Sequence, residues 1–123
     1  MKVKIFLAVV LVGSFITGCY YDVIKPVDLN KPPQNVSFSG DLQPIFDENC
    51  NSSDCHGGNH QPSLTPENAY GSLRSGGFIN TTIPTESILY KVLKSGEMPP
   101  TGALPSSDVQ KILDWIRLGA PNN

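Results

Sequence analysis

Hydrophobic side chains recur every three or four positions in four short segments of the chain, which is the spacing of one face of an α-helix. The clearest segment is SSDVQKILDWIRLGAP, whose apolar positions are Val109, Ile112, Leu113 and Ile116. A serine precedes Asp108 as a helix N-cap, Gly119 occupies the C-cap position, and Pro121 prevents continuation. This pattern predicts a helix that ends at Gly119.

An earlier segment, FSGDLQPIFDENC, predicts a helix with an apolar face formed by Leu42, Ile45, Phe46 and Cys50. Asp41 is the expected N-cap, which places Pro44 in the first turn, where a backbone N–H would have no partner within the helix. This helix would deliver Cys50 to its C-terminal end.

Two further helices are expected between these. TPENAYGSL has Thr65 as N-cap and Pro66 at the first helical position, with inward positions Ala69, Tyr70 and Leu73. ESILYKVLKSG is stopped by Gly96, and its apolar stripe is Ile88, Leu89, Val92 and Leu93. The four segments together predict an all-α domain over residues 38–123.

Length and composition limit the core of such a domain. The chain has 123 residues, including 11 prolines and 11 glycines, so one small domain is expected. Four short helices enclose only a thin hydrophobic core. A large apolar prosthetic group would complete it.

The first 37 residues have a different pattern. In residues 1–18 two lysines precede an apolar run that is too short for a permanent transmembrane helix, as in a lipoprotein signal peptide. The residues ITGC resemble the lipobox of bacterial lipoproteins, in which the cysteine is acylated; an ordinary signal peptide is the alternative. We therefore expect export, and anchoring to a bacterial membrane through Cys19 at the periplasmic face or the cell surface. Residues 19–37 contain three prolines and no helical periodicity, which predicts a lipidated, extended tether.

Net charge excludes one class of partner. Removal of Lys2 and Lys4 with the leader leaves seven basic residues against eleven acidic ones, a net charge of −4. A mildly acidic domain gives no electrostatic basis for binding nucleic acid.

The stretch CNSSDCHGG carries the strongest chemical signal, and three chemistries use such a cluster. In an oxidising compartment Cys50 and Cys55 could pair as a disulfide. A zinc ion could be offered both thiols together with His56 and His60, although zinc sites generally separate their cysteine and histidine pairs by a longer loop. Haem attachment uses two thiols and a histidine directly after the second, usually as C-x-x-C-H, whereas four residues separate the cysteines here. Haem is the favoured interpretation.

A methionine elsewhere in the chain supports that preference. Iron bound by His56 needs a sixth ligand to remain six-coordinate, and methionine or a second histidine usually supplies it. Met98 is the one methionine after the leader, and it lies in GEMPP, where two prolines would stiffen a loop. A methionine in such a loop is poorly placed to fill the core. His60 is the other residue that could serve as distal ligand.

The chain resembles the small monohaem cytochrome c domain of bacterial lipoproteins and electron-transfer enzymes. The segments that carry the resemblance are FSGDLQPIFDENC, CHGG, SLTPENAYGSL, ESILYKVLKSGEMPP and DVQKILDWIRLGAPNN. The resemblance covers residues 38–123 and implies about four short helices around one covalently attached haem c. It also implies that the N-terminal and C-terminal helices cross, here through Phe46 and Trp115.

The same resemblance implies the residues of the site and their roles. Cys50 and Cys55 would form the thioether bonds, and His56 and Met98 would be the proximal and distal ligands of the iron. A six-coordinate haem of this kind transfers single electrons, so we expect a monomeric electron carrier that serves redox partner proteins rather than a catalyst. The alternative is a disulfide-clasped or zinc-binding lipoprotein module without haem, and a haem sensor or peroxidase-like enzyme is a further possibility.

Overall fold

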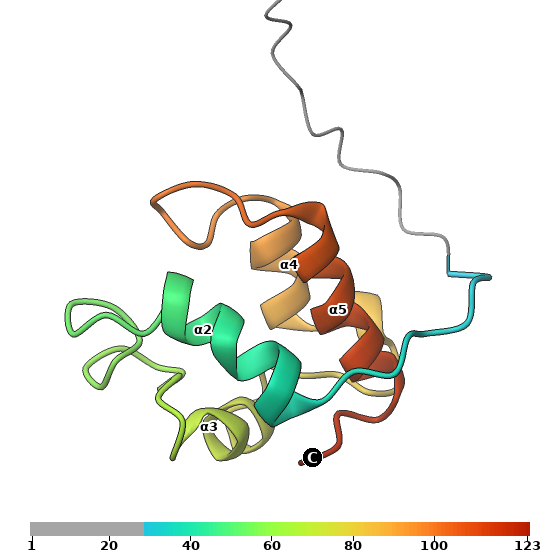
Figure 1. Cartoon of the computed structure of the whole chain (residues 1–123), viewed down its shortest axis with the longest axis horizontal. Helices are drawn as coiled ribbons and strands as arrows, with labels where there is room; N and C mark the ends of the chain where they lie inside the picture. Colours follow the sequence, from blue (N-terminus) through green and yellow to red (C-terminus); the bar gives the residue numbers. More distant parts are fainter. Residues whose placement is uncertain (1–28) are drawn as a thin grey trace, which may run out of the picture.

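The computed structural model describes residues 29–123, so the expected signal peptide, Cys19 and the first part of the expected tether lie outside the described residues. Within this range the fold is all-α, with four α-helices and no strand, as the periodicity predicts (Figure 1). In chain order the elements are η1 (Phe38–Leu42), α2 (Gln43–Asn49), α3 (Ala69–Ser75), η2 (Pro84–Glu86), α4 (Ile88–Lys94) and α5 (Ser106–Arg117). No helix of this part of the chain is long and apolar enough to cross a membrane.

The first helix begins earlier than its sequence pattern predicts, and its N-cap is Ser37 rather than Asp41. The Ser37 hydroxyl accepts a hydrogen bond from the Gly40 N–H (3.1 Å), and Asp41 accepts one from the Ser37 N–H (2.8 Å). These reciprocal bonds satisfy N–H groups that a helix start leaves without partners. The first turn is a wide π-turn, which relieves the collision between the ring of Pro44 and the Gly40 carbonyl that a regular α-helix would impose.

The expected N-caps of two other helices are also wrong. Thr65 starts a turn in which the N–H groups of Asn68 (2.9 Å) and Ala69 (2.8 Å) donate to its carbonyl, and regular α3 begins only at Ala69. Helix α5 begins directly at Ser106, after Pro105, and no side chain caps it. In both places a backbone turn enters the helix without the side-chain cap that the residue types suggest.

The predicted helix ends, in contrast, are confirmed. Gly96 has a φ of +74° just after α4, and Gly119 has a φ of +89° just after α5. Beyond α5 the N–H of Gly119 donates to Ile116 (3.0 Å) and that of Ala120 donates to Trp115 (3.0 Å). This pair of bonds is the Schellman motif, which requires a left-handed residue and so favours glycine.

An aromatic cluster joins the two ends of the domain. The ring of Phe38 lies 5.2 Å from that of Trp115, 5.4 Å from that of Tyr70 and 6.2 Å from that of Phe46. The expected crossing of the first and last helices therefore occurs, but Phe38 makes the ring contact with Trp115 that the resemblance gives to Phe46. The cause is the earlier helix start, which adds a turn containing Phe38. The fully buried side chains around it include Leu42, Leu73, Ile112, Leu113 and Ile116.

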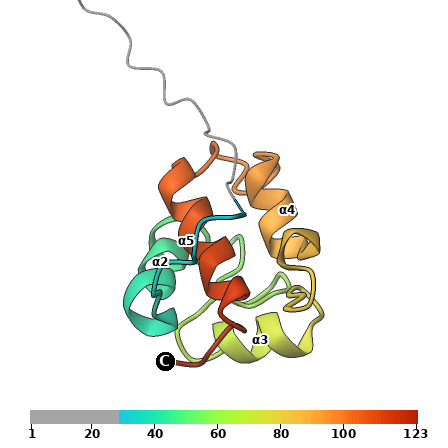
Figure 2. The same ribbon diagram turned by 90° about the vertical axis from the view of Figure 1, so that its right-hand side faces the viewer.

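Residues 29–37, which the sequence pattern assigns to the tether, lie along α5 in two orthogonal views (Figures 1 and 2). Val36 is part of the hydrophobic core, with 2% of its surface exposed. The N–H of Phe38 and the N–H of Ser39 donate to the side chain and the carbonyl of Asn123 (both 2.8 Å). The first turn of η1 is therefore held to Asn123.

Candidate cofactor site

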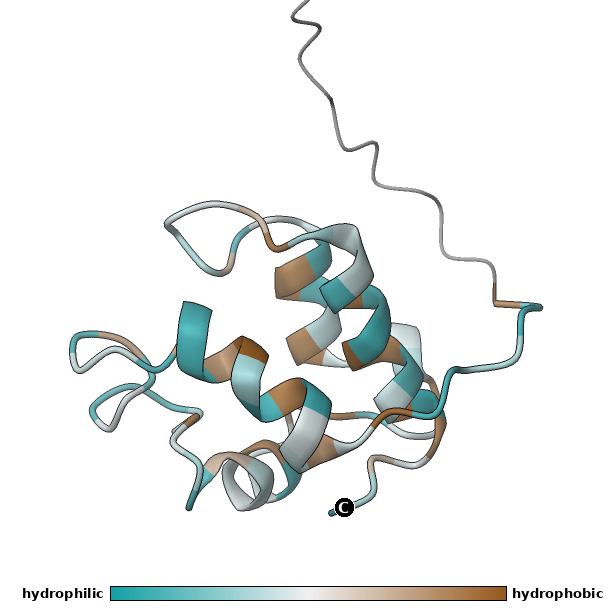
Figure 3. Cartoon of the chain, viewed as in Figure 1, coloured by the Kyte–Doolittle hydropathy of each residue, from teal (hydrophilic) through white to brown (hydrophobic). Residues whose placement is uncertain are grey.

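An apolar cavity of about 440 Å³ lies between α2, α4 and the two long loops that follow them. Hydrophobic residues alternate with hydrophilic ones along α2 and α4, the two helices that border the cavity (Figure 3). The apolar part of the lining includes Phe46, Leu64, Phe78, Leu89, Val92 and Leu93. Its size and lining are those of a pocket for an organic cofactor or ligand.

All four residues that the sequence nominates for haem line this one cavity: Cys50, Cys55, His56 and Met98. They come from three parts of the fold. Cys50 caps α2, where its N–H donates to the Phe46 carbonyl (2.8 Å); Cys55 and His56 lie in the following loop; Met98 lies in the loop after α4. Two thiols, an imidazole and a thioether therefore surround one apolar space.

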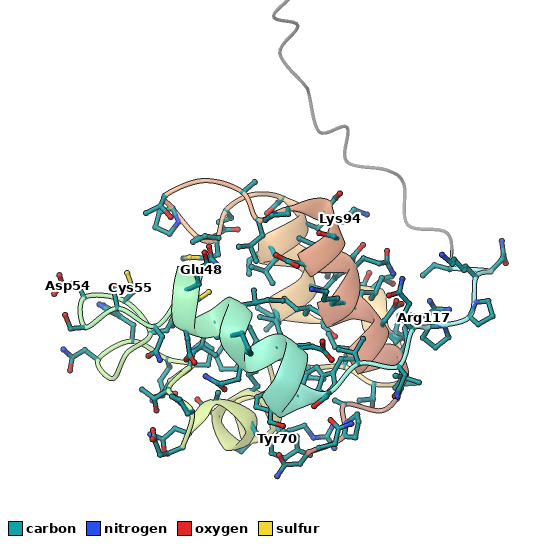
Figure 4. All side chains as sticks on the ribbon, viewed as in Figure 1. Glu48, Asp54, Cys55, Tyr70, Lys94 and Arg117 are labelled. Atoms are coloured by element: carbon teal, nitrogen blue, oxygen red, sulfur yellow. The ribbon has the colours of Figure 1, made fainter. Side chains whose placement is uncertain are left out.

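The four-residue spacer between the cysteines is folded into a closed turn. The N–H groups of Cys55 and Gly57 both donate to the Ser52 carbonyl (3.0 Å each), and the N–H of His56 donates to the Cys50 carbonyl (3.1 Å). A β-carbon at Gly57 would lie 2.5 Å from the Ser52 oxygen, so only glycine fits there. The loop projects beyond the end of α2, with Asp54 and Cys55 on it (Figure 4). Backbone bonds thus bring His56 back beside Cys50 despite the longer spacer.

The ring of His56 is oriented by backbone carbonyls. Its Nδ1 lies 2.8 Å from the carbonyl oxygen of Pro62 and 3.3 Å from that of His60. Since a carbonyl can only accept, Nδ1 carries the proton and donates. A proton on Nδ1 leaves Nε2 as the ring nitrogen whose lone pair can bind a metal. A histidine that ligates a metal almost always donates its other ring nitrogen in this way.

The thiol of Cys50 is held in its protonated form at neutral pH. Its pKa is raised from 9.0 to about 11, mainly by burial and also by repulsion from the neighbouring Cys55. Because the thiolate is the form that oxidises and exchanges disulfides, this environment slows both reactions at Cys50. Cys50 and Cys55 are free thiols in the structure.

Met98 is held by the loop that follows α4. Its N–H donates to the Val92 carbonyl (3.1 Å), and the turn after it is closed by a bond from the Gly102 N–H to the Pro99 carbonyl (3.2 Å). The residue is 37% exposed, which is unusual for a large hydrophobic side chain. Met98 therefore borders the cavity and the solvent, rather than filling the core.

The zinc interpretation needs Cys50, Cys55, His56 and His60 around one ion. Within residues 29–123, no three histidine, cysteine, aspartate or glutamate side chains are grouped closely enough to hold a metal ion. The four side chains share the lining of the cavity, but they do not form a tetrahedral set. The chemistry of the lining fits haem better, because a wide apolar space with thiols and axial-type donors at its edge is what a porphyrin requires.

Sequence reasoning missed two features of the site. The first is the Pro62 carbonyl, which fixes the tautomer of His56; a proline six residues after the histidine gives no periodic signal. The second is the wall formed by α4, whose apolar stripe was predicted without any sign that it would line the cavity. Ile88 in that stripe is 50% exposed and lines the cavity, although its spacing is that of a core residue.

Comparison of the chain with protein-family models, with curated proteins and with solved structures gives no match. The interpretation of the site therefore depends on its residues and their arrangement.

Proposed function

We propose that this protein is an exported, lipid-anchored c-type cytochrome that carries single electrons through one covalently attached haem. The observation that supports the proposal best is the convergence of Cys50, Cys55, His56 and Met98 on one apolar cavity, with Nδ1 of His56 engaged by Pro62. None of the alternative chemistries uses all four residues.

Each residue of the site has a role in the proposal. The thiols of Cys50 and Cys55 would each add across one vinyl group, S to one carbon and H to the other, so attachment needs no oxidant. Nε2 of His56 and the sulfur of Met98 would complete the coordination of the iron. Haem held in this way supplies reversible one-electron transfer. With His56 and Met98 both bound, the iron would have no open position for a substrate.

Retention of haem under denaturing conditions tests this function. We expect the exported protein, made in a host that attaches haem to proteins, to keep its haem through acid–acetone extraction, because thioether bonds survive where ligand bonds do not. The control is the double variant Cys50→Ala, Cys55→Ala, which should release any haem it holds. Full haem retention in that variant would contradict covalent attachment, and zinc without haem in the unmodified protein would favour the zinc-binding alternative.

The lipid anchor is a separate part of the proposal. Cys19→Ala is expected to release soluble protein or to block processing, because acylation requires the thiol. The measurement is partitioning of the protein between detergent and water, together with the mass of the N-terminal peptide. Ala8→Ser, a mild change within the leader, is the matched control. Normal membrane retention of Cys19→Ala would show that another feature holds the protein at the membrane.

A further inference from the structure

One guanidinium group binds the N-terminal segment to the end of α5. Nη2 of Arg117 donates to the carbonyl oxygens of Leu29 (3.0 Å) and Lys31 (2.8 Å), and Nη1 donates to Asp114 (3.2 Å). The Arg117 side chain is only 16% exposed. The planar fork of arginine can satisfy three acceptors in this way, which the ammonium group of lysine cannot reproduce.

Asp114, on the same helix, completes these contacts, and together they form a clamp between α5 and residues 29–34. Asp114 is buried, with 2% of its surface exposed. Besides Arg117, its carboxylate accepts hydrogen bonds from the Gln34 N–H (3.2 Å) and from the Gln110 side chain (2.9 Å). A buried carboxylate with charged and neutral donors is costly to disturb, since any donor removed leaves an unsatisfied charge. Residues 29–36 are therefore fixed to the domain, although their sequence is that of a tether.

The clamp lies on the side of the domain opposite the cavity. Arg117 lies beside the N-terminal segment, whereas Asp54 and Cys55 lie at the far side of the molecule (Figure 4). Figures 1 and 2 both place that segment on α5, and Figure 1 shows the loops that border the cavity on the other side of the domain. Any chain that leads from residue 29 to a membrane therefore leaves from the side opposite the cofactor site.

The length of chain between Cys19 and the clamp limits how far the domain can lie from its lipid anchor. Between Cys19 and Leu29 the chain can span at most about 35 Å, even if it is fully extended. Without the clamp, the free length would run from Cys19 to Val36, which is buried in the core, and would reach about 60 Å. The domain itself is about 30 Å across for its number of residues. With the shorter reach, the clamped side lies within about 35 Å of the anchoring lipid.

The surface beside the clamp also suits a lipid headgroup layer. Leu29 and Leu118 are 53% and 41% exposed. The Leu29 carbonyl accepts a hydrogen bond from Arg117, and Leu118 is the next residue after Arg117 in the chain. Lys31 is exposed as well. Leucine side chains can enter the interfacial layer of a bilayer, and a lysine beside them can pair with an anionic headgroup.

We propose that this clamped surface, formed by residues 29–31 and 117–118, rests on the lipid bilayer and turns the cofactor cavity toward the aqueous phase. The inference depends on the lipid anchor in the proposed function. It assigns a new role to Asp114 and Arg117: they orient the anchored domain so that redox partners in solution can reach the cavity side.

Amine labelling tests this orientation. The lipidated protein is bound to vesicles of phosphatidylcholine and phosphatidylglycerol and treated with a water-soluble acetylating reagent; the unlipidated variant Cys19→Ala serves as the reference in solution. Mass spectrometry then gives the labelling of Lys31 relative to that of Lys94 on α4. We expect this ratio to fall several-fold on vesicles. An unchanged ratio would overturn the proposed orientation.

Variants of the clamp separate orientation from anchoring. Arg117→Gln should restore Lys31 labelling on vesicles and speed hydrogen exchange at the Gln34 amide, while haem content stays unchanged. The matched control, Arg74→Gln at an exposed position of α3, should do neither. Arg117→Lys, which keeps the charge but loses the fork, should resemble Arg117→Gln and serves if that variant folds poorly. Protection that persists in both Arg117 variants would refute the clamp, whereas failure of the unmodified protein to sediment with vesicles would refute the anchor and the orientation with it.

Discussion

Replacing His56 by alanine is expected to abolish haem loading of the exported protein. Of the two histidines that line the cavity, His56 has its ring oriented by a backbone partner, the Pro62 carbonyl, which lies 2.8 Å from Nδ1. Loss of only such a supporting partner typically costs about 10–100-fold in metal affinity, so loss of the ligand itself should cost more. The measurement is haem bound per chain, from absorption after purification.

The matched control is His60→Ala. The His60 side chain lines the same cavity, but it is its backbone carbonyl, not its ring, that lies within 3.3 Å of His56 Nδ1. Haem loading should therefore remain near normal in this variant. Equal loss in both variants would indicate a general effect of the loop, and normal loading of His56→Ala would exclude it as the proximal ligand.

Replacing Met98 by alanine is expected to lower the reduction potential and to open the iron to carbon monoxide. A thioether ligand favours ferrous iron, and axial ligands set potentials over a range of about 0.8 V, so a fall on the order of 0.1 V is expected. Redox titration measures the potential, and rapid mixing of the reduced protein measures the rate of carbon monoxide binding. Glu97→Gln, in the same loop, is the control and should change neither strongly.

This variant also separates a carrier from a haem sensor or peroxidase-like enzyme. Both of the latter need a vacant or easily displaced sixth position. If the unmodified protein binds carbon monoxide as fast as Met98→Ala does, Met98 is not a stable ligand, and the sensor or enzyme should replace the carrier as the proposed function. The 37% exposure of Met98 makes this comparison informative, because the loop that holds it is not enclosed by the core.

Local sequence signals predicted the helices well and their starts poorly. The helix ends at Gly96 and Gly119 could be predicted because a left-handed backbone strongly favours glycine at one position. The starts depend on competing caps: Asp41 is chemically a good N-cap, but it bonds back to Ser37, which caps the helix instead. Such a choice is decided by the chain on both sides of the helix, and the residue type alone does not reveal it.

Contacts between distant parts of the chain were beyond prediction for a different reason. Nothing periodic in residues 29–37 indicates that Val36 enters the core or that Arg117 would bind the carbonyls of Leu29 and Lys31. The cavity residues Cys50 and Met98 were identified from their chemical types, whereas the Pro62 carbonyl belongs to the backbone and has no residue-type signal. The candidate ligands could be predicted from their residue types, whereas contacts between distant segments could be seen only in the folded structure.

The most direct test of the proposed haem is an absorption spectrum of the purified, exported protein in its oxidised and reduced forms. A covalently attached haem predicts the sharp reduced bands of a c-type haem at one haem per chain. Ligation by Met98 predicts the weak long-wavelength ferric band that the resemblance associates with iron–methionine sulfur bonding, which should disappear in Met98→Ala. A colourless protein from a host that attaches haem to other exported proteins would show that this chain is not a c-type cytochrome.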